Sequence, residues 1–188
     1  MPDPKHASLT LRDAVLQAAA HLDSADLSYG HGTDNALDEA AWLVGHTLGL
    51  ASHELDQHLA RTLTAAERKA VTEIIDARIT TRKPAAYLLK EAWFAGLRFY
   101  VDERVIVPRS LMGEFILDAF QPWINAGRVR RVLDLCTGSG CIAIAIAQHF
   151  PGAQVDAVDI SADALAVARI NVAHYGLEQR VRLIQSDL

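Results

Sequence analysis

A glycine-rich turn flanked by acidic residues is the part of the sequence best suited to chemistry. It lies between an apolar segment and a helix-forming segment and reads Asp134-Leu135-Cys136-Thr137-Gly138-Ser139-Gly140. A strand that leads through glycines into a helix directs backbone N–H groups toward one point, and the helix dipole makes that point attractive to an anion. The turn therefore predicts a cofactor-binding loop.

Two cofactor classes compete for this loop. The segment 138–143 fits the pattern G-x-G-x-x-G/A of dinucleotide-binding proteins, and Asp159 follows at the distance typical of an acid on a ribose hydroxyl. The pattern alone suits NAD or S-adenosylmethionine. Asp134 favours S-adenosylmethionine, because a carboxylate at the end of the strand repels a pyrophosphate and attracts the ammonium group of a methionine.

These residues predict a division of roles within the cofactor site. We expect Asp134 to face the ammonium, the amides of Thr137, Gly138, Ser139 and Gly140 to bind the carboxylate, and Asp159 to bind the ribose. Asp187, at the end of a third predicted strand, is suited to accept from the adenine amino group. Cys136 stands where many such loops have their first glycine, which a small side chain suits if the backbone there is not left-handed.

Composition narrows the class of protein. The chain has 188 residues, 51% of them apolar, and a net charge of −5, which argues against a surface that coats nucleic acid. The apolar runs are too short to span a bilayer, and the segment 1–6 lacks the apolar stretch of a signal peptide. Cys136 and Cys141 fit no zinc spacing, so we expect two reduced, mostly buried thiols, no metal and a cytoplasmic protein without membrane contact.

Residues 1–85 are predicted to form a helical bundle. A capping box at Thr64 and Glu67 begins one helix, Asp34 and Asn35 are capping candidates for another, and Pro84 limits the last. Apolar stripes at helical spacing predict the inward faces. Their members are Leu11, Val15, Leu16, Ala19 and Leu22, then Leu37, Ala40, Ala41, Val44 and Leu48, then Val71, Ile74, Ile75, Ile79 and, on the same face, Arg78.

Residues 86–127 are predicted to form a β-hairpin and a connecting helix. Aromatic and β-branched residues over 93–101 and 105–107 flank a charged turn at 102–104. The following segment, 111–124, predicts a short helix that Pro122 breaks. Its inward side chains are expected to be Met112, Phe115, Ile116 and Phe120.

Residues 128–188 alternate between strand and helix. Strands are predicted at 132–135, 155–158 and 181–184, with helices at 140–150 and, capped by Ser161, up to residue 174. This order predicts an α/β fold with a parallel, Rossmann-like sheet and right-handed crossovers. Three strands are too few for a complete sheet, so we expect part of a longer protein, with disorder or intermolecular pairing near 181–188.

Several segments resemble the HemK-type protein-glutamine methyltransferases, and most closely their ribosomal-protein branch. The match runs from about residue 84 to the end of the chain. The segments that carry it are 92–96, 99–105, 107–110, Gly113-Glu114, 134–143 with its cysteine in the first-glycine place, 156–161 and 186–188.

The resemblance implies a class I methyltransferase that moves a methyl group from S-adenosylmethionine to the side-chain amide nitrogen of a glutamine in a large-subunit ribosomal protein. It also implies that the helical N-terminus recognises the substrate and that Ile160 and Arg109 lie near the cofactor; a salt bridge between Arg109 and Glu114 is the alternative. The family holds the amide nitrogen in an Asn-Pro-Pro-Tyr loop after the fourth strand. This sequence contains no such tetrapeptide, so no catalytic residue can be assigned.

Three other functions stay open at this point. The first is the release-factor branch of the same family. The second is a cofactor-binding or protein-binding module without catalysis, and the third is an NAD-dependent oxidoreductase, since the glycine pattern alone fits a dinucleotide.

Overall fold

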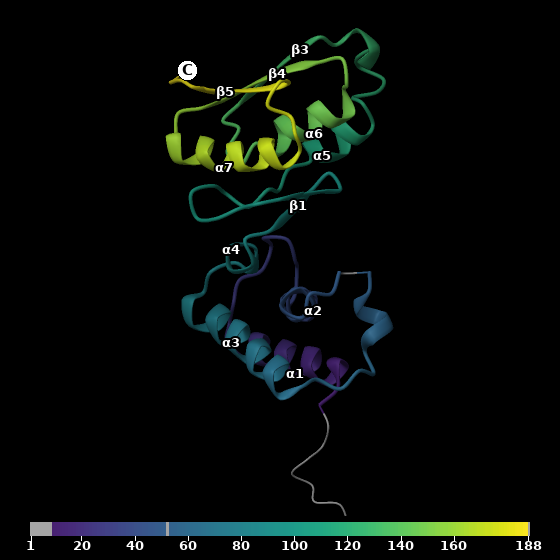
Figure 1. Ribbon diagram of the computed structural model, residues 1–188, viewed down its shortest axis with the longest axis vertical. Coiled ribbons are helices and arrows are strands. Elements are labelled where there is room, and N and C mark those ends of the chain that lie inside the picture. The colour runs from purple at the N-terminus through teal and green to yellow at the C-terminus, as the bar shows by residue number, and fades with distance from the viewer. Residues whose placement is uncertain (1–8, 52, 188) are drawn as a thin grey trace, which may run out of the picture. The chain divides into compact units, whose positions relative to one another are not determined.

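The computed structural model describes residues 9–51 and 53–187, which form two compact units that divide between Leu89 and Lys90 (Figure 1). The sequence placed this boundary at residue 85. The division falls later because α4 (Ala85–Leu89) packs on helices of the first unit. Within the described residues, no helix is long and apolar enough to cross a membrane.

The first unit is helical, as predicted. It contains α1 (Leu11–Asp23), α2 (Ala36–Thr47), the short 3-10 helix η2 (Leu55–His58), α3 (Ala65–Thr81) and α4. The three long helices begin at the side-chain caps Thr10, Asn35 and Thr64. The predicted capping box of Thr64 with Glu67 is confirmed, and it satisfies backbone groups that the first turn leaves unpaired.

The core of this unit follows the predicted stripes with two exceptions. Leu11, Leu22, Leu43 and Val44 are fully buried. Leu16 and Leu37, however, are 53% and 49% exposed, so their predicted inward position is wrong. The buried side of α1 is completed instead by Ala14 and Ala18, and that of α2 by Ala36 and Ala40. These small side chains let the helices pack closely on the faces that the leucines were expected to occupy.

A buried ion pair crosses the helical core. The Nε atom of Arg78 on α3 lies 2.7 Å from an oxygen of Glu39 on α2, and both side chains are almost completely buried. Arg78 also donates to the carbonyl of Ser28 at 3.1 Å. The sequence placed Arg78 on the inward face, which is confirmed, and Glu39 supplies the charge that such burial requires.

The second unit begins with a β-hairpin whose turn lies earlier than predicted. Strands β1 (Ala92–Phe94) and β2 (Leu97–Phe99) pair antiparallel around Ala95 and Gly96, which have φ angles of 49° and 74°. Positive φ angles at both central residues are typical of a tight, two-residue hairpin turn. The predicted turn at 102–104 is therefore wrong as a hairpin turn. That segment folds locally, with Asp102 accepting hydrogen bonds from Arg104 and from the Tyr100 hydroxyl.

The connecting helix is shorter than expected. Helix α5 covers Met112–Leu117, and a further short 3-10 helix, η3, covers Ala126–Arg128. Ile116 is fully buried as predicted, whereas Phe115 is 41% exposed and was wrongly placed inward. The chain leaves the helical conformation after Leu117, well before Pro122, because Ala119 and Phe120 adopt left-handed backbone angles.

A parallel sheet completes the unit, as the sequence predicted, and its strand order is β3-β4-β5. Its strands are β3 (Arg131–Leu135), β4 (Gln154–Asp159) and β5 (Val181–Gln185), connected by α6 (Cys141–His149) and α7 (Ala162–His174). The predicted cap of Ser161 on α7 is confirmed. Because β5 forms a regular strand on β4, the disorder expected over 181–188 is not observed for residues 181–185. The alternative, pairing of this edge with another chain, stays a prediction, and Leu188 lies outside the described residues.

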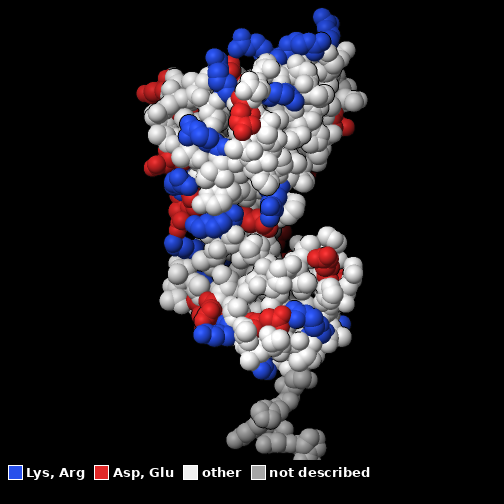
Figure 2. Space-filling model, viewed as in Figure 1, with Lys and Arg blue, Asp and Glu red and all other residues white. Residues whose placement is uncertain are grey.

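Helices cover one face of this sheet and leave the other open within the described residues. Figure 1 shows α5, α6 and α7 on the same side of β3, β4 and β5. On the open face, Leu133 is 59% exposed, and Asp156 forms ion pairs with Arg131 and Arg182 on its two neighbouring strands at 2.9 and 2.8 Å. Figure 2 shows basic side chains gathered at this end of the unit.

Candidate functional site

The glycine loop, residues 136–140, joins the carboxyl end of β3 to the start of α6. Three of its residues have left-handed backbone angles: Cys136 at φ 59°, Gly138 at 55° and Gly140 at 79°. The sequence analysis expected a side chain at position 136 to fit if the backbone there is not left-handed. The backbone of Cys136 is left-handed, so this condition is not met. Its side chain is also exposed rather than buried. Cys136 thus occupies a conformation that glycine adopts without strain and other residues adopt at a cost.

The two glycines serve different purposes. A Cβ atom at Gly140 would lie 3.3 Å from the Cβ of Ala168, so this glycine permits close packing of the loop on α7. A Cβ atom at Gly138 would meet nothing within 4 Å. Open space beside a left-handed glycine at the carboxyl end of a parallel sheet is where a ligand can approach the backbone.

Asp134 lies under the loop as a buried carboxylate. It is 8% exposed and accepts a hydrogen bond from the Thr137 hydroxyl at 2.6 Å. Burial raises the pKa of Asp134, and the nearby charge of Asp159 raises it further, while the bonds from Thr137 and the backbone of Ala143 lower it. The loop therefore has two carboxylates beside it, an arrangement that opposes a pyrophosphate and suits a cation.

Asp159, at the end of β4, holds the glycine loop in place. One of its oxygens accepts the backbone N–H of Gly138 and the other that of Ser161, both at 2.9 Å. The amides of Thr137 and Gly140 are also engaged, by Val158 and Thr137 carbonyls. The sequence assigned these amides to a ligand carboxylate, but in this structure three of them bond within the chain because Asp159, the adjacent strand and the loop itself supply acceptors.

The remaining predicted residues are exposed. Ile160 directly follows Asp159 and is 63% exposed, with its carbonyl accepting from the side chain of Gln185. Asp187 is exposed beyond the end of β5. Arg109 is exposed in the segment between β2 and α5, and among the described residues no ion pair joins it to Glu114.

A residue that the sequence analysis missed supports the loop from α7. The side chain of Asn171, 1% exposed, donates to the carbonyl of Ser139 at 2.9 Å and exchanges two hydrogen bonds with the backbone of Tyr100. The signal available in the sequence was one amide side chain on a helix face that otherwise buries Val167, Ala168 and Val172. A buried amide requires partners, and here they are the loop and the hairpin segment.

The Cys141 thiol is buried at the start of α6. Burial raises the pKa of the Cys141 thiol to about 11, which keeps it protonated and unreactive. Over the described residues, no three histidine, cysteine or acidic side chains gather in a way that could hold a metal ion.

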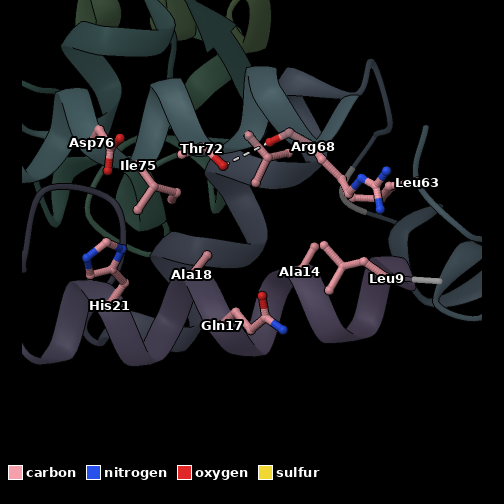
Figure 3. Close-up of a pocket in the computed structure, with 11 residues that line it drawn as sticks. Leu9, Ala14, Gln17, Ala18, His21, Leu63, Arg68, Thr72, Ile75 and Asp76 are labelled. Carbon is pink, nitrogen blue, oxygen red and sulfur yellow. Dashed lines mark hydrogen bonds between the residues drawn. The ribbon is translucent and has the colours of Figure 1, made fainter. Parts of the chain in front are cut away.

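The helical unit contains a hollow of about 260 Å³ between α1 and α3 (Figure 3). It is lined by Ala14, Ala18 and His21 from α1 and by Ile75 and Asp76 from α3. It holds none of the predicted cofactor-binding residues.

Comparison with known proteins matches both units to families. Residues 13–89 match the family described as PrmC N-terminal domain, and residues 114–188 match the methyltransferase small domain. The chain is 54% identical over 180 residues to a ribosomal protein uL3 glutamine methyltransferase of Burkholderia pseudomallei, covering 95% of this chain and 59% of that protein. By these matches the chain is similar to the HemK-type protein-glutamine methyltransferases. Its resemblance to this family, stated from short segments, is thereby confirmed.

Further relatives extend this HemK-family match. Proteins of the same description from Neisseria meningitidis and Bradyrhizobium diazoefficiens are 52% and 48% identical, over 95% and 96% of this chain. Each alignment covers 59% of the relative. The chain therefore spans about three fifths of the length of the curated relatives it matches. This part includes both the helical unit and the glycine loop.

Proposed function

We propose that this chain binds S-adenosylmethionine at the glycine loop and that, within an enzyme of its relatives' full length, it serves methylation of the side-chain amide nitrogen of a glutamine in ribosomal protein uL3. The observation that carries the cofactor proposal is the pair of carboxylates, Asp134 and Asp159, each hydrogen-bonded to the loop. The reaction and the substrate are those for which the relatives are named.

The residues at the loop fit this cofactor. The open space at Gly138 admits a ligand close to the backbone. Asp134 supplies negative charge for an ammonium, Asp159 an acceptor for a ribose hydroxyl, and the exposed Ile160 an apolar surface for an adenine ring. When bound, S-adenosylmethionine supplies a methyl group on a sulfonium, which needs no metal or redox partner.

We also propose roles for Asp187, for Arg109 and for the helical unit. Asp187 and Arg109 are exposed and able to turn toward the adenine and the methionine carboxylate, respectively. The PrmC N-terminal match supports substrate recognition by the helical unit. Ribosomal proteins are made in the cytoplasm, so we place the activity there. We propose no nucleic-acid or membrane partner.

Calorimetry on this chain tests the cofactor. Titration with S-adenosylhomocysteine is expected to give saturable binding, and titration with NAD none. Binding of NAD alone would replace the methyltransferase proposal with the oxidoreductase alternative. Absence of both would leave a protein-binding module as the better description.

A methyl-transfer assay tests the reaction and its substrate. The chain extended to its relatives' full length is incubated with labelled S-adenosylmethionine and either purified uL3 or a purified release factor. We expect label in uL3 alone, on a glutamine located by mass spectrometry. Label only in the release factor would assign the protein to the other branch of the family.

A further inference from the structure

One face of α7 holds two separate segments of the second unit. Ala168, Asn171 and Tyr175 lie at helical spacing on this face. Ala168 is the residue that Gly140 packs against. The hydroxyl of Tyr175 accepts from the backbone N–H of Arg98 at 2.9 Å and donates to its carbonyl at 2.7 Å. The glycine loop and the end of the hairpin therefore meet the same helix.

Asn171 hydrogen-bonds to both segments through its side chain. Its Oδ1 accepts the N–H of Tyr100 at 2.8 Å, and its Nδ2 donates to the carbonyls of Tyr100 at 3.0 Å and Ser139 at 2.9 Å. Both amide hydrogens are used, and the two carbonyls fix which end of the amide is the donor. The side chain is 1% exposed, so water cannot replace these bonds.

The bond to Ser139 falls where the loop is most constrained. Ser139 lies between two left-handed glycines, and its carbonyl orientation helps to set the peptide plane that leads into Gly140, the N-cap of α6. The bonds to Tyr100 fix the segment that continues into the Asp102–Arg104 pair and then toward Arg109. Moving either segment breaks a bond to the same amide.

We propose that Asn171 is a positioning residue that fixes the glycine loop in its ligand-binding conformation and couples that conformation to the segment after β2. Asn171 touches no ligand and acts through Ser139. The inference rests on the proposed function of the glycine loop in binding S-adenosylmethionine.

Asn171→Asp is the direct test, with Tyr175→Phe as its matched control. Asn171→Asp keeps the size and the acceptor for Tyr100 but replaces the donor with an oxygen that faces two carbonyls. Tyr175→Phe keeps the ring and removes the bonds to Arg98, leaving the loop bond intact. Hydrogen–deuterium exchange on the ligand-free chain compares the peptides that cover 98–102 and 136–141, and calorimetry measures S-adenosylhomocysteine affinity.

We expect Asn171→Asp to speed exchange in both peptides and to weaken S-adenosylhomocysteine binding by about tenfold or more, the scale of a lost buried hydrogen bond. Tyr175→Phe is expected to speed exchange over 98–102 only and to keep the affinity within about twofold. If Asn171→Asp fails to fold by circular dichroism, Asn171→Ser, which shortens the side chain without adding charge, is analysed in the same way.

Three results would overturn the inference. One is unchanged exchange over 136–141 in a folded Asn171 variant. Another is an unchanged affinity in that variant, and the last is an equal loss of affinity in Tyr175→Phe, which indicates general destabilisation. If the unsubstituted chain binds no S-adenosylhomocysteine, the proposed function fails, and the exchange pattern still decides whether Asn171 positions the loop.

Discussion

The carboxylate of Asp159 accepts the backbone N–H of Gly138 at 2.9 Å, so a side chain at the end of β4 fixes the middle of the loop that follows β3. Its second oxygen accepts the N–H of Ser161 at the start of α7. One acid thus ties together the loop, a strand end and a helix start. A ribose hydroxyl that approached Asp159 would share an acceptor already used to shape the site.

Asp159→Asn is expected to loosen this arrangement. An amide has one accepting oxygen, so either Gly138 or Ser161 would face an NH2 donor. We expect a loss of about 1–3 kcal/mol in the free energy of unfolding and S-adenosylhomocysteine binding at least about tenfold weaker, measured by urea denaturation and calorimetry. Asp118→Asn, at an exposed position, is the control. Equal effects of the two substitutions would contradict the assigned role of Asp159.

Cys136→Gly is expected to stabilise the chain. Cys136 has φ 59°, a conformation that costs a side-chain-bearing residue about 1–2 kcal/mol, partly offset by the greater freedom of glycine when unfolded. The expected net gain is about 0.5–1 kcal/mol in urea denaturation. Cys136→Ala removes the thiol but keeps Cβ, and it should leave stability nearly unchanged. A gain in the alanine variant equal to that in glycine would assign the effect to the thiol.

The strands and helices of the parallel sheet were predictable because the sequence patterns that indicate them are local. The cap at Ser161, the glycines of the loop and the apolar runs of the strands each act within a few residues, and the structure confirms the elements they indicate. The hairpin turn was predicted at the wrong place because that prediction also used only local composition. The charged segment 102–104 has the composition of a turn. The actual turn at Ala95 and Gly96 requires left-handed backbone angles at both residues, and an alanine in the sequence does not predict such an angle.

The contacts that shape the site could not be read from the sequence. Asn171 bonds residues 71 and 32 positions away, and no local pattern links an amide on a helix to either partner. The sequence likewise placed acids beside the loop without revealing that Asp159 would occupy the Gly138 amide. Residue types predicted the class of ligand, while the pairing of donors and acceptors depended on the folded arrangement.

Asp134→Asn is expected to raise stability near neutral pH and to weaken ligand binding. Burial raises the pKa of Asp134 in the folded chain, so ionising this group costs folding free energy. Its stabilising contribution is complete below the pKa of the unfolded chain, about 4, and is lost as the pH rises through the folded value. The variant should therefore exceed the unsubstituted chain in urea denaturation at pH 7, with the difference shrinking toward pH 4. A variant less stable at both values would contradict this account.

The ion pair of Glu39 with Arg78 gives the largest expected change in stability. Glu39→Ala leaves a buried guanidinium without its carboxylate, which costs about 3–5 kcal/mol in the free energy of unfolding. Glu73→Ala, which removes the exposed pair with Lys69 at 3.7 Å, should cost less than about 1 kcal/mol. Urea denaturation of the two variants compares a buried and an exposed pair that share α3.

A double variant distinguishes the net contribution of the Glu39–Arg78 pair to the free energy of unfolding from the cost of leaving one of its charges unpaired. Glu39→Leu combined with Arg78→Met replaces both charges with apolar side chains, so no unpaired charge stays in the core. We expect this chain to recover most of the stability lost in Glu39→Ala, because desolvation of two ions offsets much of their attraction. The Ser28 carbonyl, which loses its donor, limits the recovery. A double variant as unstable as the single one would show that the pair itself, rather than the avoidance of an isolated charge, stabilises the helical unit.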